Sequence, residues 1–141
     1  MKTTNDIITH ARDVLQTEGR AILALAEQID EAFLDAARTI YECSGKVVLT
    51  GVGKAGIIGQ KISATLASTG TLSIYLHPVE ALHGDLGRLQ RDDVVIALSN
   101  SGASREIVEL LDHMKRRGAT KGVASLCAGG GMGTALVLER G

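Results

Sequence analysis

The segment KVVLTGVGKAGIIGQ, residues 46–60, decides the fold of this chain. Residues 47–50 form a short, apolar, largely β-branched run, which predicts a buried strand. Residues 51–56 have the spacing GxGxxG and lead into an apolar helix predicted over about 57–68. Glycines between a strand and a helix let backbone N–H groups face an anion at the positive end of the helix. The segment therefore predicts an α/β domain with a phosphate-binding loop, to which Lys54 adds a positive charge.

The residues around this glycine loop bear on its other interpretations. A dinucleotide-binding loop needs an acidic residue about 20 positions later to hold a ribose. Here the second predicted strand, residues 72–76, runs into His77-Pro78 without a carboxylate. A Walker loop is excluded because no Gly-Lys-Ser/Thr closes the motif. A plain tight turn stays open as the alternative to phosphate binding.

Strands and helices alternate along the rest of the chain. A third strand is predicted over 94–98, a polar loop over 99–104 and a helix over 105–117 that ends at Gly118 as its C-cap. Residues 123–126 predict a fourth parallel strand, and 135–138 a fifth that returns antiparallel across a short glycine turn. This order predicts a parallel sheet with helices on both faces, a flavodoxin- or Rossmann-like three-layer fold. Ligands of such sheets bind at the carboxyl ends of the strands.

The chain divides into three segments of one domain. Residues 1–43 are expected to form N-terminal helices, 44–119 the α/β core and 120–141 a tail. Apolar residues recur at helical spacing over 6–43, and Gly19 is expected to separate two helices. These helices are expected to cover the core, or, in the alternative, the second of them builds an oligomer interface.

Composition excludes several functional classes. The chain of 141 residues is long enough for one domain with a real core. Aromatic residues make up only 2%, too few for base stacking, and the net charge of −1 gives no attraction to nucleic acid or an anionic membrane. No apolar run approaches the roughly 20 residues of a membrane span. Because Cys43 and Cys127 form no disulfide framework, we expect a reduced, cytoplasmic protein without partners among nucleic acids or membranes.

The polar loop after the third predicted strand is a second candidate phosphate site. Ser99, Ser101 and Ser104 precede a helix, and their hydroxyls with free helical N–H groups suit a dianionic phosphate ester. The alternative is a single N-cap serine within a polar turn. Residues 77–85 concentrate His, Glu and Asp, but a polar loop is a commoner reason for this than a metal site. Neither a metal nor a cofactor is expected.

These motifs together resemble a known family. The run GVGKAGIIGQKISATLASTGT at 51–71, with segments 77–87, 93–96 and 99–106, resembles the D-arabinose 5-phosphate isomerases of the sugar isomerase (SIS) domain family. The resemblance covers about 10–119. It implies a sheet between helices, a homo-oligomer (dimer or tetramer) and conversion of D-ribulose 5-phosphate to D-arabinose 5-phosphate in lipopolysaccharide biosynthesis.

The resemblance also implies roles for individual residues. Ketose–aldose interconversion passes through an enediol and needs a base, an acid and positive charge for the developing oxyanion. By resemblance Lys54 stabilises the oxyanion or the phosphate end, Glu106 is the base or acid, and His83 lines the pocket as a third candidate catalytic residue. Without the resemblance, Glu106 is an ordinary first-turn glutamate facing the helix dipole. The candidate substrate-binding residues are Gly51, Gly53, Ser99, Ser101, Ser104, Thr65 and Asp85.

The family pattern changes after about residue 119. A second glutamate, a late histidine and the regulatory CBS pair of the family are not found there. Residues from about 110 to 141 instead resemble the C-terminus of biosynthetic thiolases, so a truncated SIS-type sheet completed by a thiolase-like β-hairpin is expected. Cys127 is expected to be a small buried residue rather than a thiolase acid/base. The alternatives to an isomerase are a non-catalytic phosphosugar-binding module, a nicotinamide-dependent oxidoreductase and a rearranged product without a function.

Overall fold

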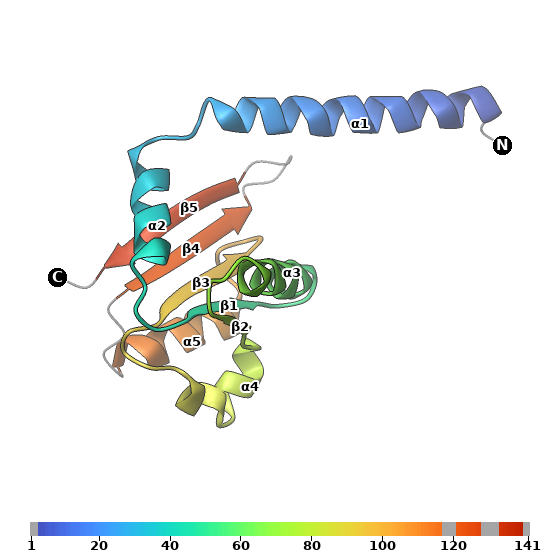
Figure 1. Ribbon diagram of the computed structural model, residues 1–141. Coiled ribbons are helices and arrows are strands. Elements are labelled where there is room, and N and C mark those ends of the chain that lie inside the picture. The colour runs from blue at the N-terminus through green and yellow to red at the C-terminus, as the bar shows by residue number, and fades with distance from the viewer. Residues whose placement is uncertain (1–2, 117–120, 128–132, 140–141) are drawn as a thin grey trace.

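The computed structural model describes residues 3–116, 121–127 and 133–139. Its strands form one five-stranded sheet in the order β2-β1-β3-β4-β5 (Figure 1). The strands are β1 (Val47–Gly51), β2 (Ser73–Tyr75), β3 (Val94–Ser99), β4 (Lys121–Cys127) and β5 (Gly133–Glu139). The pairs β1–β2, β1–β3 and β3–β4 are parallel, and β5 runs antiparallel to β4. The predicted parallel sheet and the antiparallel return of its last strand are both confirmed.

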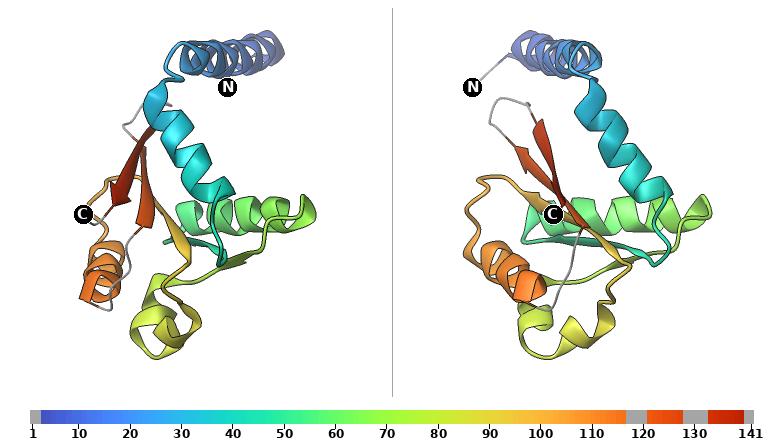
Figure 2. Two further views of the ribbon diagram at one scale, coloured as in Figure 1. Left: turned by 60° about the vertical axis from the view of Figure 1, so that its left-hand side comes forward. Right: turned by 90° about the vertical axis from the view of Figure 1, so that its left-hand side faces the viewer.

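Helices cover both faces of the sheet. The helices of the described residues are α1 (Thr4–Ala26), α2 (Glu31–Tyr41), α3 (Lys54–Ser68), α4 (Pro78–Leu82), the 3-10 helix η1 (Asp85–Arg88) and α5 (Arg105–Arg116), and all but α1 pack on the sheet. α2 and α3 lie on one face and α4, η1 and α5 on the other (Figure 2). Alternate residues of the strands serve the two layers: Val95 of β3 packs with Leu110 of α5, whereas its neighbour Val94 packs with Ala36 of α2. Because alternate strand residues pack against helices on opposite faces, the domain has the predicted three layers.

The two N-terminal helices differ from the prediction. Gly19 lies inside α1, and the break falls instead between α1 and α2, at residues 27–30. A glycine inside a helix costs only about 1 kcal/mol relative to alanine, so it does not by itself end a helix. Asp30 starts the new helix, because its carboxylate accepts hydrogen bonds from the N–H groups of Ala32 and Phe33 at 3.0 and 3.2 Å.

Only the second N-terminal helix covers the core. α2 buries Ala36 and Thr39, whereas α1 has no buried residue. α1 runs away from the sheet and lies apart from the helical layers (Figure 1). The prediction that both helices cover the core is therefore wrong for α1, whose 23 residues expose apolar side chains such as Ile22 and Leu23.

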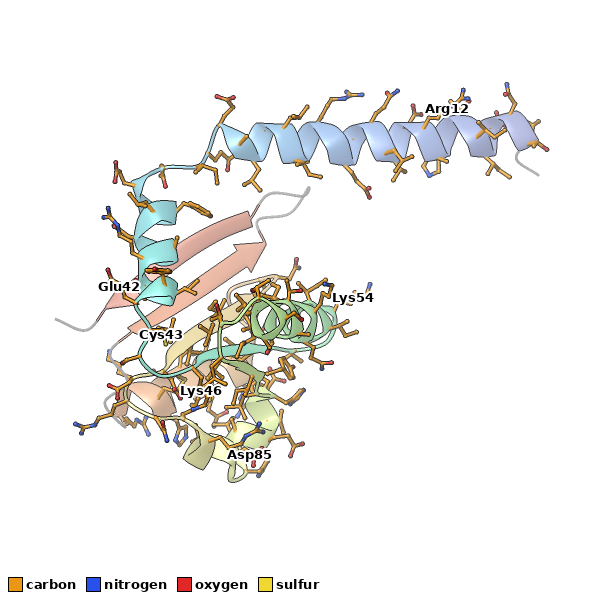
Figure 3. The ribbon with its side chains drawn as sticks, in the orientation of Figure 1. Arg12, Glu42, Cys43, Lys46, Lys54 and Asp85 are labelled. Carbon is orange, nitrogen blue, oxygen red and sulfur yellow. The ribbon has the colours of Figure 1, made fainter. Side chains whose placement is uncertain are left out.

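A buried carboxylate ties the beginnings of β1 and β3 together. The Oδ1 of Asp93 accepts from the Lys46 N–H at 3.0 Å, and its Oδ2 accepts from the Gln90 N–H at 2.8 Å and from Lys46 Nζ at 2.7 Å (Lys46 is labelled in Figure 3). Burial alone raises the pKa of Asp93, but the Lys46 and backbone hydrogen bonds outweigh it and hold that pKa below its usual value. The carboxylate therefore stays charged and fixes the register of the two strands whose other ends carry the candidate site.

Several expectations fall on residues outside the described part of the chain. Gly118 as the helix end and the glycine turn at 129–131 are among them, as is the side chain of Cys127. The division into segments 1–43, 44–119 and 120–141 stays a prediction. In the described part of the chain, no helix combines the length and the apolar character that a membrane span requires.

Candidate functional site

Two loops meet at the carboxyl edge of the sheet. β1 and β3 are neighbours, and Gly51 at the end of β1 is in register with Leu98 near the end of β3. The helix after β1, α3, returns along one face of the sheet, and the helix after β3, α5, returns along the other. A parallel sheet has its ligand crevice where consecutive connections depart to opposite faces. The structure thus brings the glycine loop and the serine loop side by side at this point.

The glycine loop ends in an open helix N-terminus. Gly53 has a φ of 60°, is the N-cap of α3, and no side chain caps the helix there. A Cβ at Gly53 would meet nothing within 4 Å, so the space beside this backbone is open. The exposed Lys54 is the first residue of α3 (Figure 3). First-turn N–H groups lack intrahelical partners and carry the positive end of the helix dipole, so this end suits an anion.

The other glycines of the motif lie where α3 packs closely on the strands. A Cβ at Gly56 would lie 2.6 Å from the Tyr75 hydroxyl and 2.7 Å from the Gly51 carbonyl oxygen. A Cβ at Gly51 would lie 3.0 Å from backbone atoms of Ala55 and Gly56. Both positions are buried. The GxGxxG spacing therefore combines one open position, Gly53, with two positions where α3 packs closely on the strands.

The serine loop is held by its own hydroxyl groups. Ser99 Oγ lies 3.0 Å from Ser104 Oγ and accepts from the Gly102 N–H at 3.0 Å. Ser101 Oγ accepts from the Ala103 N–H at 3.2 Å. A serine hydroxyl that accepts a hydrogen bond still has a proton to donate. The loop is therefore a polar turn held by its serines, and the same serines still offer hydroxyl donors to a phosphate oxygen.

The start of α5 adds charged groups to this edge. Arg105 is the exposed first residue of α5, and the half-buried Glu106 is the second. Arg105 is a second cation at this edge, beside the predicted Lys54. Lys54 and Glu106, the two main candidate catalytic residues, thus come from the two loops that meet. A carboxylate beside cationic groups and helix N-termini can exchange protons while the positive charges stabilise an oxyanion.

Three predicted site residues are not brought to these loops within one chain. Thr65 lies eleven residues after Lys54 on α3, about 16 Å along the helix axis, and its hydroxyl donates to the Lys61 carbonyl at 3.0 Å. Asp85 begins η1, where Arg88 donates to it at 3.1 Å, and Figure 3 shows it well apart from Lys54. His83 is the exposed C-cap of α4, two residues before Asp85. α3 carries Thr65 away from the loops, and the segment of His83 and Asp85 packs on the α5 side of the sheet, so the roles of all three residues in the site stay predictions.

Two residues at the edge were missed. Tyr75 donates its hydroxyl to the Gly51 carbonyl at 2.6 Å, and its ring lies edge-on to His77 with centroids 6.5 Å apart. His77 is the N-cap of α4, and its Nδ1 accepts from the Val79 N–H at 3.3 Å. Tyr75 is the last residue of β2, the neighbour of β1, and His77 lies two residues after it. Within the described ranges, no three His, Cys, Asp or Glu side chains gather as a metal site would require.

One buried hydroxyl beneath the edge has no partner. Thr50 is 0% exposed, and its Oγ1 accepts from and donates to none of the described residues. It is in register with Ala97 of β3, two residues before Ser99 on the same face. A buried hydroxyl without a hydrogen bond costs about 1–3 kcal/mol. Thr50 is thus a local cost to stability directly below the serine loop.

The fold and this edge define a class: an α/β domain with a mostly parallel sheet, in which two helices begin after the ends of two adjacent strands. The sequence model of the SIS domain family matches residues 40–130 of the chain. The chain belongs to the SIS domain family. That match runs past residue 119, and the comparisons lend no support to the thiolase-like ending, which stays a prediction.

Curated relatives share the sequence at high identity. The arabinose 5-phosphate isomerase KdsD of Pseudomonas aeruginosa is 47% identical over 120 residues, 85% of this chain and 37% of the relative. KdsD of Escherichia coli K12 is 49% identical over 105 residues, 74% of this chain and 32% of the relative. The chain thus spans about a third of the length of these relatives.

Solved structures have the same fold. An Escherichia coli protein solved in complex with arabinose 5-phosphate matches with a TM-score of 0.78 and 41% identity, over 83% of this chain and 62% of that one. A Listeria monocytogenes protein described as a putative sugar-phosphate isomerase matches with a TM-score of 0.80 and 30% identity, over 85% of this chain and 63% of that one. These likenesses confirm the expected α/β architecture with a parallel sheet flanked by helices.

Proposed function

We propose that the chain binds a sugar phosphate at the edge formed by the two loops and interconverts D-ribulose 5-phosphate and D-arabinose 5-phosphate. The observation that carries the proposal is the register of Gly51 with Leu98, which places Lys54 and the three loop serines at one end of two adjacent strands. The relatives named arabinose 5-phosphate isomerase support the choice of substrate. The solved complex with arabinose 5-phosphate supports it as well.

The chemistry assigns roles to the chain's own residues. The phosphate is bound by the hydroxyls of Ser101 and Ser104 and by the open N–H groups of the two helices. These neutral donors suit a dianion, because they stabilise its charge without a full positive charge for each oxygen. Glu106 takes a proton from C1 of the ketose, and a proton reaches the C2 oxygen to give the enediol. Return of a proton to C2 and loss of one from the C1 oxygen then gives the aldose. Lys54 stabilises the negative charge that develops on oxygen.

A homo-oligomer and a cytoplasmic location belong to the same proposal. α1 has no buried residue, and Leu15, Ile22 and Leu23 on it are more than two thirds exposed. A helix that buries none of its residues lacks the tertiary packing that supplies most helix stability in proteins, so a second copy that covers these side chains supports the helix. Sedimentation of the full chain tests the oligomer, and a purely monomeric protein at micromolar concentration would contradict it.

The function is tested by turnover and by binding on the same protein. Ribulose 5-phosphate is supplied, and the aldose is detected by a coupled reaction; a rate above background is expected. Lys54→Ala should lose the rate, whereas Lys61→Ala, seven residues further along the exposed side of α3, is the matched control and should keep it. No turnover in a folded sample would reject the isomerase.

Binding separates the isomerase from the non-catalytic module. A ligand at 100 times its dissociation constant stabilises a fold by about 2.7 kcal/mol, which is a shift in melting temperature of roughly 3–6 °C for a chain of this size. A shift with arabinose 5-phosphate but no turnover would identify a phosphosugar-binding module. No shift with any pentose or hexose phosphate would reject both functions.

A further inference from the structure

The carbonyl groups of β1 point alternately to its two neighbouring strands. The Lys46 carbonyl accepts from the Val94 N–H of β3 at 3.1 Å, and the Leu49 carbonyl accepts from the Leu76 N–H beside β2 at 2.9 Å. Gly51 comes two residues after Leu49, so its carbonyl also points to the β2 side. The next donor of this parallel ladder would be the residue two positions after Leu76. That residue is Pro78, which has no N–H.

The side chain of Tyr75 supplies the donor that the backbone lacks. Its hydroxyl donates to the Gly51 carbonyl at 2.6 Å. The ring lies against α3, where a Cβ at Gly59 would be 3.4 Å from it and a Cβ at Gly56 would be 2.6 Å from the hydroxyl. Burial raises the pKa of the Tyr75 phenol, so the proton needed for donation is retained at neutral pH.

The direction of this carbonyl determines where the glycine loop points. Among the described residues every peptide bond is trans, and in a planar trans peptide the C=O and the N–H point in opposite directions. With the Gly51 carbonyl held toward β2, the Val52 N–H is directed to the β3 side, where the serine loop begins. Gly53 then turns the chain and opens α3 at Lys54.

We propose that Tyr75 is a positioning residue, whose hydroxyl holds the Gly51 carbonyl and thereby orients the loop of residues 51–54 toward the anion. The inference rests on the proposed function for the identity of the ligand, but the orientation of the loop does not depend on it. The proposal also explains the glycine at position 56, because a Cβ there would lie 2.6 Å from the Tyr75 hydroxyl and would displace the phenol from its acceptor.

The test compares two hydroxyl deletions on the same strand. Tyr75→Phe removes the bond at the carboxyl end of β1. Ser73→Ala removes a hydroxyl at its amino end, where Ser73 Oγ lies 2.9 Å from the Val47 carbonyl and 3.0 Å from Ser63 Oγ. Each variant loses a bond from a β2 hydroxyl to a β1 carbonyl, and Ser73→Ala loses the contact with Ser63 as well, so a merely structural role predicts effects at least as large in Ser73→Ala. Loss of one such hydrogen bond corresponds to about a fivefold change in an equilibrium constant.

Binding of arabinose 5-phosphate is the first readout. We expect the dissociation constant to rise about fivefold in Tyr75→Phe and to stay within twofold of the wild type in Ser73→Ala. If the wild type binds the ligand and the two variants have equal dissociation constants, the positioning role is overturned.

Hydrogen exchange of the ligand-free protein is the second readout. The Ile57 N–H donates to the Gly53 carbonyl at 3.2 Å and so reports the junction of the loop with α3. Its exchange should be about fivefold faster in Tyr75→Phe than in Ser73→Ala. Equal exchange overturns the proposal whatever the ligand does. A wild type that binds no sugar phosphate rejects the proposed function instead, and the exchange rates then decide the role of Tyr75 alone.

Discussion

The ammonium of Lys46 lies 2.7 Å from the carboxylate of Asp93, and the carboxylate side chain is 1% exposed. This contact joins the residues that directly precede β1 and β3, at the end of each strand opposite the candidate site. Since the same carboxylate also accepts two backbone N–H groups, it is the most fully hydrogen-bonded charge in the described part of the chain. Its removal affects the whole sheet rather than the ligand.

Loss of the Asp93 charge should destabilise the fold strongly. Asp93→Ala leaves the largely buried Lys46 ammonium and two N–H groups without their acceptor, and removal of one member of a buried ion pair costs about 3–5 kcal/mol. Urea denaturation measures the change. Asp92→Ala removes the neighbouring exposed carboxylate and should change stability by less than about 0.5 kcal/mol. Equal losses of unfolding free energy in both variants would show that the ion pair does not contribute to stability beyond an exposed carboxylate.

The stability contributed by Asp93 should depend on pH in one direction. Its pKa is lower in the folded than in the unfolded chain, so the contribution is complete above the unfolded value of about 3.9 and is lost as the pH falls through the folded value. The difference in unfolding free energy between wild type and Asp93→Asn should therefore shrink on acidification below about pH 4. Denaturation curves between pH 7 and pH 3 measure it, and a difference that grows over this range would refute the assignment.

Replacement of the unpartnered Thr50 hydroxyl should stabilise the protein. Thr50→Val keeps the shape of the side chain and removes a buried polar group that has no described hydrogen bond, a gain of about 1 kcal/mol. Thr39→Val is the matched control, because the Thr39 hydroxyl is also buried but donates to the Asp35 carbonyl at 2.8 Å. Thermal denaturation should shift upward for the first variant and downward for the second. A downward shift for both would mean that Thr50 does have a partner.

Alanine should have opposite effects at two glycines. Gly56→Ala places a methyl group 2.6 Å from the Tyr75 hydroxyl, which overpacks the contact of α3 with the strands and costs about 1–3 kcal/mol. Gly19→Ala lies in the exposed helix α1 with nothing within 4 Å, so it should increase helix stability by about 1 kcal/mol. Circular dichroism during heating measures both. A harmless Gly56→Ala would contradict the close packing around Tyr75.

The sheet could be predicted from the sequence because its strands are short apolar runs bounded by glycines and polar turns. Residues 47–50 and 94–98 were predicted within a residue of β1 and β3, and even the antiparallel return of the last strand followed from the length of its turn. The N-terminal break was misplaced, because glycine marks a weak point in a helix whereas the Asp30 cap decides where the next one begins.

The site was predicted in part for a similar reason. Residues that follow directly from β1 and β3 meet because register and topology bring strand ends together. The other predicted residues, Thr65, His83 and Asp85, lie in or after helices. There the number of residues from a strand end no longer tells how far a side chain lies from the site. Tyr75 was missed because its role depends on a hydrogen bond to the Gly51 carbonyl, 24 positions away, and no local sequence pattern predicts such a bond.

The two borders of the sheet differ in how they can meet other chains. β2 has only three residues, so foreign strands find little to pair with there. β5 has seven residues and is paired on one side only within the described chain. We therefore expect another chain to add a strand, and aggregation to begin, at the unpaired edge of β5. A lysine that faces the solvent on this strand would oppose such pairing.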